Sequence, residues 1–303
     1  MDWTFAAAGL VTGFLVGLTG TGGGALMTPI LTLLLGVPPL AAVSTDLVTS
    51  VVMKPFAVLV HLRQHTIRWR IALWLCVGSV PAAFVGAMVD GLLRSARVDG
   101  ILRILLGAAL LLAVASTVVR MYLDLRKRPE NPGVEPEAAV APGRLVLIGV
   151  VVGFIVGVTS VGSGSLVMVT LLLMYPRLSA GRLVGTDLAQ ALPLVASAAL
   201  GHLFFGEVHF GLVAGLLVGS IPGAVIGALL SSRAPSRVIR VTLAVVLLAS
   251  GLSLLGLAAL TTLIVVAVAA LIAATAWFLL ARTTHSAAAN EKTTVPSKGR
   301  ELL

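Results

Sequence analysis

The chain has 303 residues, of which 58% are hydrophobic and 11% charged, and its formal net charge is +9. A soluble globular domain does not need so much apolar sequence, whereas apolar stretches that recur from end to end are typical of a polytopic helical membrane protein. A closed membrane β-barrel is excluded because its strands alternate apolar and polar residues. We attribute the positive charge to the positive-inside bias of membrane proteins, so no nucleic-acid partner is expected.

In chain order, the N-terminus "MDWTFAAAGL" lacks the positive region of a cleavable signal and predicts a retained first membrane segment. The predicted apolar segments run at about 3–18, 25–35, 42–60, 71–89, 101–120, 145–159, 166–175, 184–205, 211–230, 238–257 and 260–281. The segments 25–35 and 166–175 are too short to cross a hydrocarbon core, which needs ~20 helical residues. Each follows a peptide rich in glycine and small polar residues, so each predicts a broken helix pair.

The chain repeats itself. "GFLVGLTGTGGGAL" from Gly13 and "GFIVGVTSVGSGSL" from Gly153 agree at 8 of 14 positions. With one inserted residue the match continues from "STDL" at Ser44 to "GTDL" at Gly185, and from His61 to His202. Such a duplication is the usual architecture of secondary transporters.

Lysine and arginine positions predict the topology. If each broken pair is a re-entrant hairpin, each half has three spans, and 15 basic residues of the loops and tail lie on one side against two on the other. This asymmetry favours inverted halves with the N-terminus outside and the C-terminus in the cytoplasm. The prediction is an all-α polytopic membrane protein with an inverted repeat, two re-entrant hairpins and about seven full spans. Its parts are a first repeat (1–120), a cytoplasmic linker (121–144), a second repeat (145–257), an additional helix (258–283) and a disordered cytoplasmic tail (284–303).

The two breaks predict an anion site. Irregular backbone at membrane depth is tolerated only where it is buried in protein or lines a wet cavity. The N–H groups and positive dipole ends of helices that begin near Ala25 and Ser165 would face that cavity. The predicted substrate-binding residues are Thr19, Gly20, Thr21, Gly22, Gly23, Gly24, Thr159, Ser160, Gly162, Ser163, Gly164 and Ser165. The alternative is tight helix packing through small residues, to which we assign the spacing Gly9-x-x-x-Gly13-x-x-x-Gly17.

Ionisable residues within apolar segments are costly and usually functional. Asp46 and Asp187 occupy matching "TDL" positions and are either helix N-caps or groups for proton binding and lining of the site. Lys54 either attracts an anion or pairs with Asp46, or else it extends to an interface. Gln190 takes the place of Thr49. These four residues (Asp46, Asp187, Lys54 and Gln190) are the candidates for proton coupling or gating.

His61 and His202 end equivalent helices that would lie on opposite membrane faces, so they cannot share a metal ion. They are either interfacial anchors or proton relays. Glu207 and His209 are expected in a short external loop, and Pro81 and Pro222 are matched prolines within helices.

Catalysis finds no support in the sequence. Cys76 is the only cysteine, which excludes an internal disulfide and a cysteine metal cluster. No Ser-His-Asp grouping, paired-carboxylate cleft or H-E-x-x-H spacing is present. We therefore expect no catalytic residue, no metal and no cofactor.

The stretch "GLTGTGGGALMTPILTLLLGVPPLAAVSTDL", repeated more weakly as "GVTSVGSGSLVMVTLLLMYPRLSAGRLVGTDL", resembles the sulfite exporter TauE/SafE family of membrane permeases over roughly residues 3–257. The resemblance implies transport of sulfite, sulfoacetate, thiosulfate or similar anions across a bacterial inner membrane without ATP hydrolysis. The second break departs from the family pattern, with "SVGSGS" where glycine is commoner, which bears on selectivity at Ser163 and Ser165.

The sequence therefore predicts a proton-coupled secondary transporter for a small sulfur-containing or organic anion, working by alternating access in the inner membrane. A passive anion channel on the same architecture is the alternative.

Overall fold

The structure is a computed structural model that describes residues 3–19, 24–93, 99–126, 141–176, 178–231, 236–258 and 260–268. Within these ranges every regular element is a helix. The chain forms two compact units, Met1–Leu257 and Ala258–Leu303. In the second unit residues 260–268 are helical, while the rest of the predicted additional span and the tail lie outside the described residues, as does most of the predicted linker.

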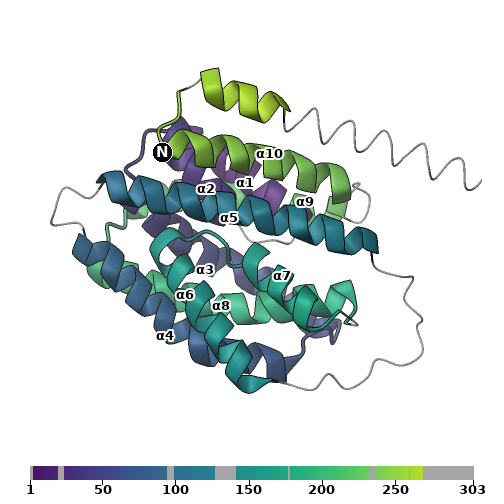
Figure 1. The fold of residues 1–303 in the computed structure, drawn as a ribbon. Coiled ribbons are helices and arrows are strands. Elements are labelled where there is room, and N and C mark those ends of the chain that lie inside the picture. The colour runs from purple at the N-terminus through teal and green to yellow at the C-terminus, as the bar shows by residue number, and fades with distance from the viewer. Residues whose placement is uncertain are drawn as a thin grey trace, which may run out of the picture. The chain divides into compact units, whose positions relative to one another are not determined.

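Ten α-helices and one π-helical turn make up the described part of the first unit (Figure 1). In order they are α1 (Trp3–Thr19), α2 (Gly24–Pro29), η1 (Ile30–Leu34), α3 (Pro39–Arg63), α4 (Trp69–Leu93), α5 (Asp99–Arg126), α6 (Pro142–Thr159), α7 (Ser165–Met174), α8 (Ala180–Phe205), α9 (Phe210–Ser231) and α10 (Ser236–Leu254). The π-helical turn η1 continues directly from α2. Pro81 and Pro222 lie inside α4 and α9, as predicted.

Six of the described helices are long and apolar enough to cross a membrane, namely α3, α4, α5, α6, α8 and α9. Five of them contain spans that the sequence predicts. The sixth, α6, was expected to be half of a hairpin, yet its 18 residues reach the length of a span. The predicted span 238–257 corresponds to α10, whose apolar stretch, Val241–Leu254, is shorter than a full span. Six described helices therefore reach the length of a span, while the predicted span 260–281 lies mostly outside the described residues.

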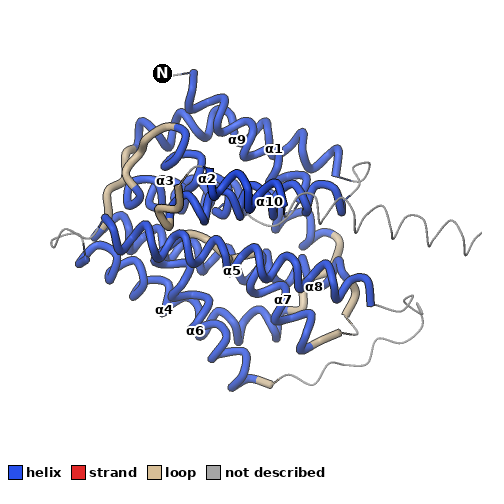
Figure 2. Tube along the Cα trace, turned by 45° about the horizontal axis from the view of Figure 1, so that its top comes forward, coloured by secondary structure: helices blue, strands red, loops and turns tan. Residues whose placement is uncertain are grey.

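The two copies of the repeat exchange equivalent helix contacts. Helix α1 of the first copy packs along α9 of the second, and α6 of the second packs along α4 of the first. Figure 2 shows both pairs side by side. The equivalent helices α5 and α10 also contact each other, as do α3 and α8. Each half is therefore completed by helices of the other half.

Glycines make these exchanged contacts close. A Cβ atom on Gly13 of α1 would collide with the backbone of Ser220 on α9. The matching Gly153 of α6 faces the backbone of Ser79 on α4 in the same way. Gly9 likewise lies against Leu216. The packing interpretation of the Gly9 and Gly13 spacing is thus confirmed, because the backbones approach where a side chain would not fit.

Helices α3 and α8 run antiparallel through the centre of the first unit. Ser44 near the start of α3 contacts His202 near the end of α8, with 2.8 Å between Oγ and Nδ1. At the other end, His61 of α3 lies beside Gly185 of α8. The central positions of both helices are buried, and they include most of the polar residues that the sequence places in apolar segments.

The glycine contacts yield a stability prediction. Gly153→Leu should lower the free energy of unfolding by about 1–3 kcal/mol, because the leucine side chain must displace the Ser79 backbone. Gly143→Leu on the same helix is the matched control, since no atom lies within 4 Å of the position of its Cβ. Thermal unfolding of the two purified variants measures the difference, and equal melting temperatures would contradict the packing role.

Candidate functional site

The backbone leaves the helix at the second predicted break. Helix α6 ends at Thr159, and Ser160 follows in the left-handed conformation with φ 58°. Gly162 has φ 104°, a value that side chains other than that of glycine rarely allow, and α7 starts at Ser165. Residues 160–164 are all buried. The sequence thus correctly places a non-helical, enclosed peptide here.

The first break lies largely outside the described residues. Gly20, Thr21, Gly22 and Gly23 belong to that gap, between the last residue of α1, Thr19, and the first residue of α2, Gly24. The expectation that the two breaks face each other therefore stays a prediction. The first broken pair is represented at the site by Thr28 of α2.

Asp46 connects the two broken segments. Its Oδ2 accepts hydrogen bonds from Ser160 Oγ at 2.6 Å and from Thr28 Oγ1 at 3.1 Å. Ser50, one turn along α3, donates to Oδ1 at 3.4 Å. Asp46 is fully buried and lies within α3, seven residues after its first residue, so the N-cap interpretation is wrong. Its carboxylate binds side chains of three separate segments instead.

Lys54 donates from Nζ to Ser163 Oγ in the second break, at 3.1 Å. Only 6% of Lys54 is exposed, so it does not extend to an interface, and that alternative is wrong. It interacts electrostatically with both Asp187 and Asp46. The ammonium group therefore lies among the break and the two matched carboxylates, where it can attract an anion.

The equivalent residues of α8 are buried as well. Asp187 is 2% exposed and, like Asp46, lies inside its helix, so it is not an N-cap either. Its Oδ1 has no hydrogen-bond partner among the described residues. Gln190 is fully buried and donates from Nε2 to Ser79 Oγ at 2.9 Å, while its Oε1 is left without a partner in the same part of the chain.

The two histidines differ. His61 is half-buried, and its Nδ1 lies 2.9 Å from Thr66 Oγ1. His202 is fully buried and contacts Ser44 Oγ and the carbonyl oxygen of Gly157, each at 2.8 Å, so it is not an interfacial anchor. Its Nδ1 also lies 3.9 Å from a carboxyl oxygen of Asp90, which is fully buried on α4.

Asp90 and Thr28 are polar residues of this region that the sequence reasoning missed, as are Ser50 and Ser79. Asp90 had a usable signal, since it is an acidic residue directly at the end of the apolar run 71–89. Thr28 had none, because a threonine in an apolar helix usually bonds to its own backbone. Its contact with Asp46 depends on how α2 packs against α3.

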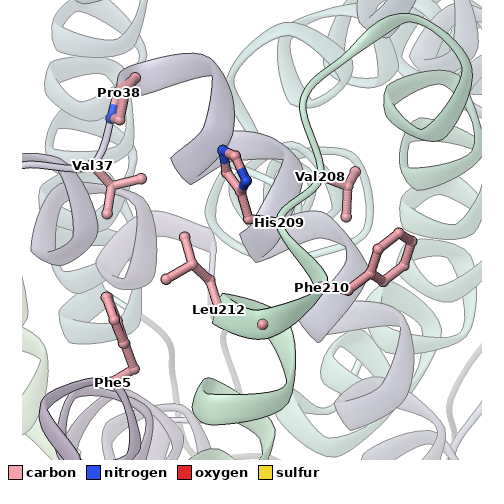
Figure 3. Close-up of a pocket in the computed structure, with 8 residues that line it drawn as sticks. Phe5, Val37, Pro38, Val208, His209, Phe210 and Leu212 are labelled. Carbon is pink, nitrogen blue, oxygen red and sulfur yellow. The ribbon is translucent and has the colours of Figure 1, made fainter. Parts of the chain in front are cut away.

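A surface cavity of about 690 Å³ lies at the end of the α3 and α8 pair that carries Ser44 and His202. Its lining comes from α1, from the turn before α3, from the segment that joins α8 to α9 and from the first turn of α9: Phe5, Val37, Pro38, Val208, His209, Phe210, Gly211 and Leu212. Figure 3 shows the His209 ring among these side chains. None of the predicted substrate-binding residues that the structure describes lines this cavity.

Comparison with known proteins gives the family. The family model described as sulfite exporter TauE/SafE matches residues 5–254. A probable membrane transporter protein of Bacillus subtilis (strain 168), YjnA, is 41% identical over 257 residues, which cover 84% of this chain and all of that protein. A second from the same organism, YunE, is 24% identical over 223 residues, 67% of this chain and 78% of that protein. No solved structure matches. The family description, the relative's name and the apolar helices together indicate a multi-pass membrane transporter and not an enzyme. The chain belongs to the sulfite exporter TauE/SafE family.

Proposed function

We propose that this transporter moves a small sulfur-containing or organic anion, such as sulfite, a sulfonate or thiosulfate, together with a proton. The observation that carries the proposal is the buried peptide Ser160–Gly164 with the Lys54 ammonium bonded to its Ser163. A buried cation beside an unwound peptide suits an anion whose oxygens accept several hydrogen bonds. The family description adds sulfite as the substrate class to test first.

The anion would bind to backbone N–H groups and hydroxyls of the two breaks. In the second break the hydroxyl groups come from Ser160, Ser163 and Ser165, and Ser165 Oγ has no hydrogen-bond partner among the described residues. By the repeat, residues 19–24 would supply equivalent groups from the first half. Because Gly20–Gly23 lie outside the described residues, the first half of this site rests on the sequence repeat alone.

Charge balance favours a coupled proton. Two buried carboxylates, Asp46 and Asp187, interact with the ammonium group of Lys54, and Asp187 also interacts with Arg120. Adding an anion there increases the negative charge in a place where charge is expensive to bury. A proton that enters with the anion removes this cost. Asp187 is the preferred acceptor because its Oδ1 has no hydrogen-bond partner in the described part of the chain, whereas Asp46 accepts three hydroxyl bonds.

Alternating access would follow from inverted halves. The antiparallel course of α3 and α8, which are equivalent in the repeat, supports the inversion. Movement of one half against the other would then open the site to each side in turn. We place the protein in the bacterial inner membrane with its N-terminus outside, on the strength of the lysine and arginine asymmetry.

A screen of anions tests the function itself. Sulfite, thiosulfate or sulfoacetate should raise the melting temperature of the purified protein, whereas neutral sugars should leave it unchanged, because only an anion is attracted by Lys54. Proteoliposomes loaded with the active anion separate transporter from channel: a pH step should drive accumulation against the gradient, and mere equilibration would favour the channel. Stabilisation by sugars alone would contradict the anion site.

Lys54→Gln should weaken anion binding by about tenfold to a hundredfold, because a charge-assisted hydrogen bond is replaced by a neutral one. Arg63→Gln, at the exposed end of the same helix, removes the same charge far along α3 and should bind normally. Titration calorimetry of both variants with the anion found in the screen measures the difference. Equal loss in the two variants would point to a general charge effect and not to a site.

Ser160→Ala should destabilise the protein by about 1.5–3 kcal/mol, the range for a hydrogen bond to a charged group, since Asp46 loses its 2.6 Å donor. Ser165→Ala on the same segment removes a hydroxyl without a described partner and should change stability far less. Chemical unfolding of the two variants without anion provides the comparison. If they are equally stable, Asp46 does not hold the second break.

A further inference from the structure

We propose that Asp90 and His202 form a buried proton-binding site that controls the second break through the carbonyl group of Gly157. The pair is separate from the carboxylates beside Lys54: it lies near the end of α8 and contacts α3, α4 and α6. Its proton binding stands by itself, while its use in transport rests on the proposed function.

The break releases the carbonyl group that His202 contacts. In a continuous helix the Gly157 oxygen would accept from the N–H of Val161, four residues on. That N–H instead donates to Thr159 Oγ1 at 3.2 Å, because the helix ends at Thr159. His202 Nε2 lies 2.8 Å from the Gly157 oxygen and replaces the lost donor. The imidazole thus stabilises the last turn before the break.

Counting hydrogens at His202 shows what a proton would change. A carbonyl oxygen can only accept, so Nε2 carries a hydrogen. Ser44 has a single hydroxyl hydrogen and two acceptors in reach at 2.8 Å, the Leu40 oxygen and His202 Nδ1. All three contacts are hydrogen bonds at once only if Nδ1 also carries a hydrogen. The observed geometry therefore fits the doubly protonated imidazolium ring.

Asp90 supplies the balancing charge. One of its carboxyl oxygens lies 3.9 Å from Nδ1, both residues are fully buried, and neither oxygen has a hydrogen-bond partner among the described residues. If the pair loses its proton, either Ser44 abandons Leu40 or Gly157 loses its donor, and a carboxylate is left buried without a counter-charge. Both results are costly, so proton release and loosening of the break should occur together.

The surroundings contain few competing groups. From the packed helices the ring is approached by Ser44 of α3, Asp90 of α4 and Gly157 of α6, of which only Asp90 is titratable. Glu207 and His209 follow in the segment after α8, and His209 lines the surface cavity at this end. Arg94, four residues after Asp90, lies outside the described residues.

The repeat provides an internal comparison. His61 is the counterpart of His202, but it is half-buried and bonds Thr66. The counterpart of Asp90 is Ser231. Of the two matched histidines, only His202 is therefore fully buried beside a buried acid, which comes from the other half, so the pair is not a by-product of the duplication. His61→Gln is accordingly the matched control.

Hydrogen–deuterium exchange of the full-length purified protein tests the site without any substrate. After correction for intrinsic exchange, residues 157–164 of the wild type should exchange more slowly at about pH 5 than at about pH 9, because the protonated pair holds Gly157. Asp90→Asn, which removes the counter-charge, should lose this pH dependence. His202→Gln keeps a donor for Gly157 but cannot take up a proton, and should lose it too. His61→Gln should behave as the wild type.

The proposal is overturned if the wild type shows no pH dependence in this segment, or if the dependence survives in both Asp90→Asn and His202→Gln. Transport is measured separately, in proteoliposomes. Both variants should still bind the anion, but with an affinity that no longer changes with pH, and should lose accumulation driven by a pH gradient. A wild type that neither binds nor accumulates anions would refute the proposed function, while the exchange result would still decide the proton site.

Discussion

The 2.6 Å hydrogen bond from Ser160 to Asp46 is the contact on which the arrangement of the site depends. It joins the unwound peptide of the second half to the central helix of the first half, and Thr28 adds the first broken segment to the same carboxyl oxygen. At this depth water does not compete for the carboxylate, so internal donors must satisfy it. Asp46 therefore fixes where the second break lies, and Ser163 then meets Lys54.

This central contact requires that the helices around it be held without polar groups of their own. The exchanged glycine contacts do so, since the backbones of α1 and α9, and of α4 and α6, approach where any side chain would collide. Close apposition gives dispersion attraction in a membrane, where the hydrophobic effect adds little between helices. The polar residues are therefore not needed to hold these helices together, and most of them lie around α3 and α8.

Much of the helix packing and the position of the second break could be predicted from the sequence, because the duplication places the same residue pattern in both halves. Gly13 and Gly153 share one packing role, and the break after Thr159 follows from residues that a helix does not favour. The errors arose where a local signal has two tertiary outcomes. The N-cap alternative for Asp46 and Asp187 arose because an acid after threonine often begins a helix, but helices α3 and α8 start seven residues earlier, at Pro39 and directly after Ser179. Lys54 and His202 were ambiguous, since only packing determines whether a long polar side chain points inward.

The duplication also explains where function should depart from symmetry. A pair of identical halves would present the same groups to both sides of the membrane and could not assign different tasks to them. Here Lys54 is replaced by Val195 in the second half, and Asp90 by Ser231, so the first half has two ionisable residues that the second half lacks. Lys54 contacts the second break directly, and Asp90 reaches the same break through His202 and Gly157. Both residues that break the symmetry come from the first half and act on the peptide of the second. A charge change at either one therefore shifts the same short segment, which is how a proton and an anion can be made to depend on each other without touching.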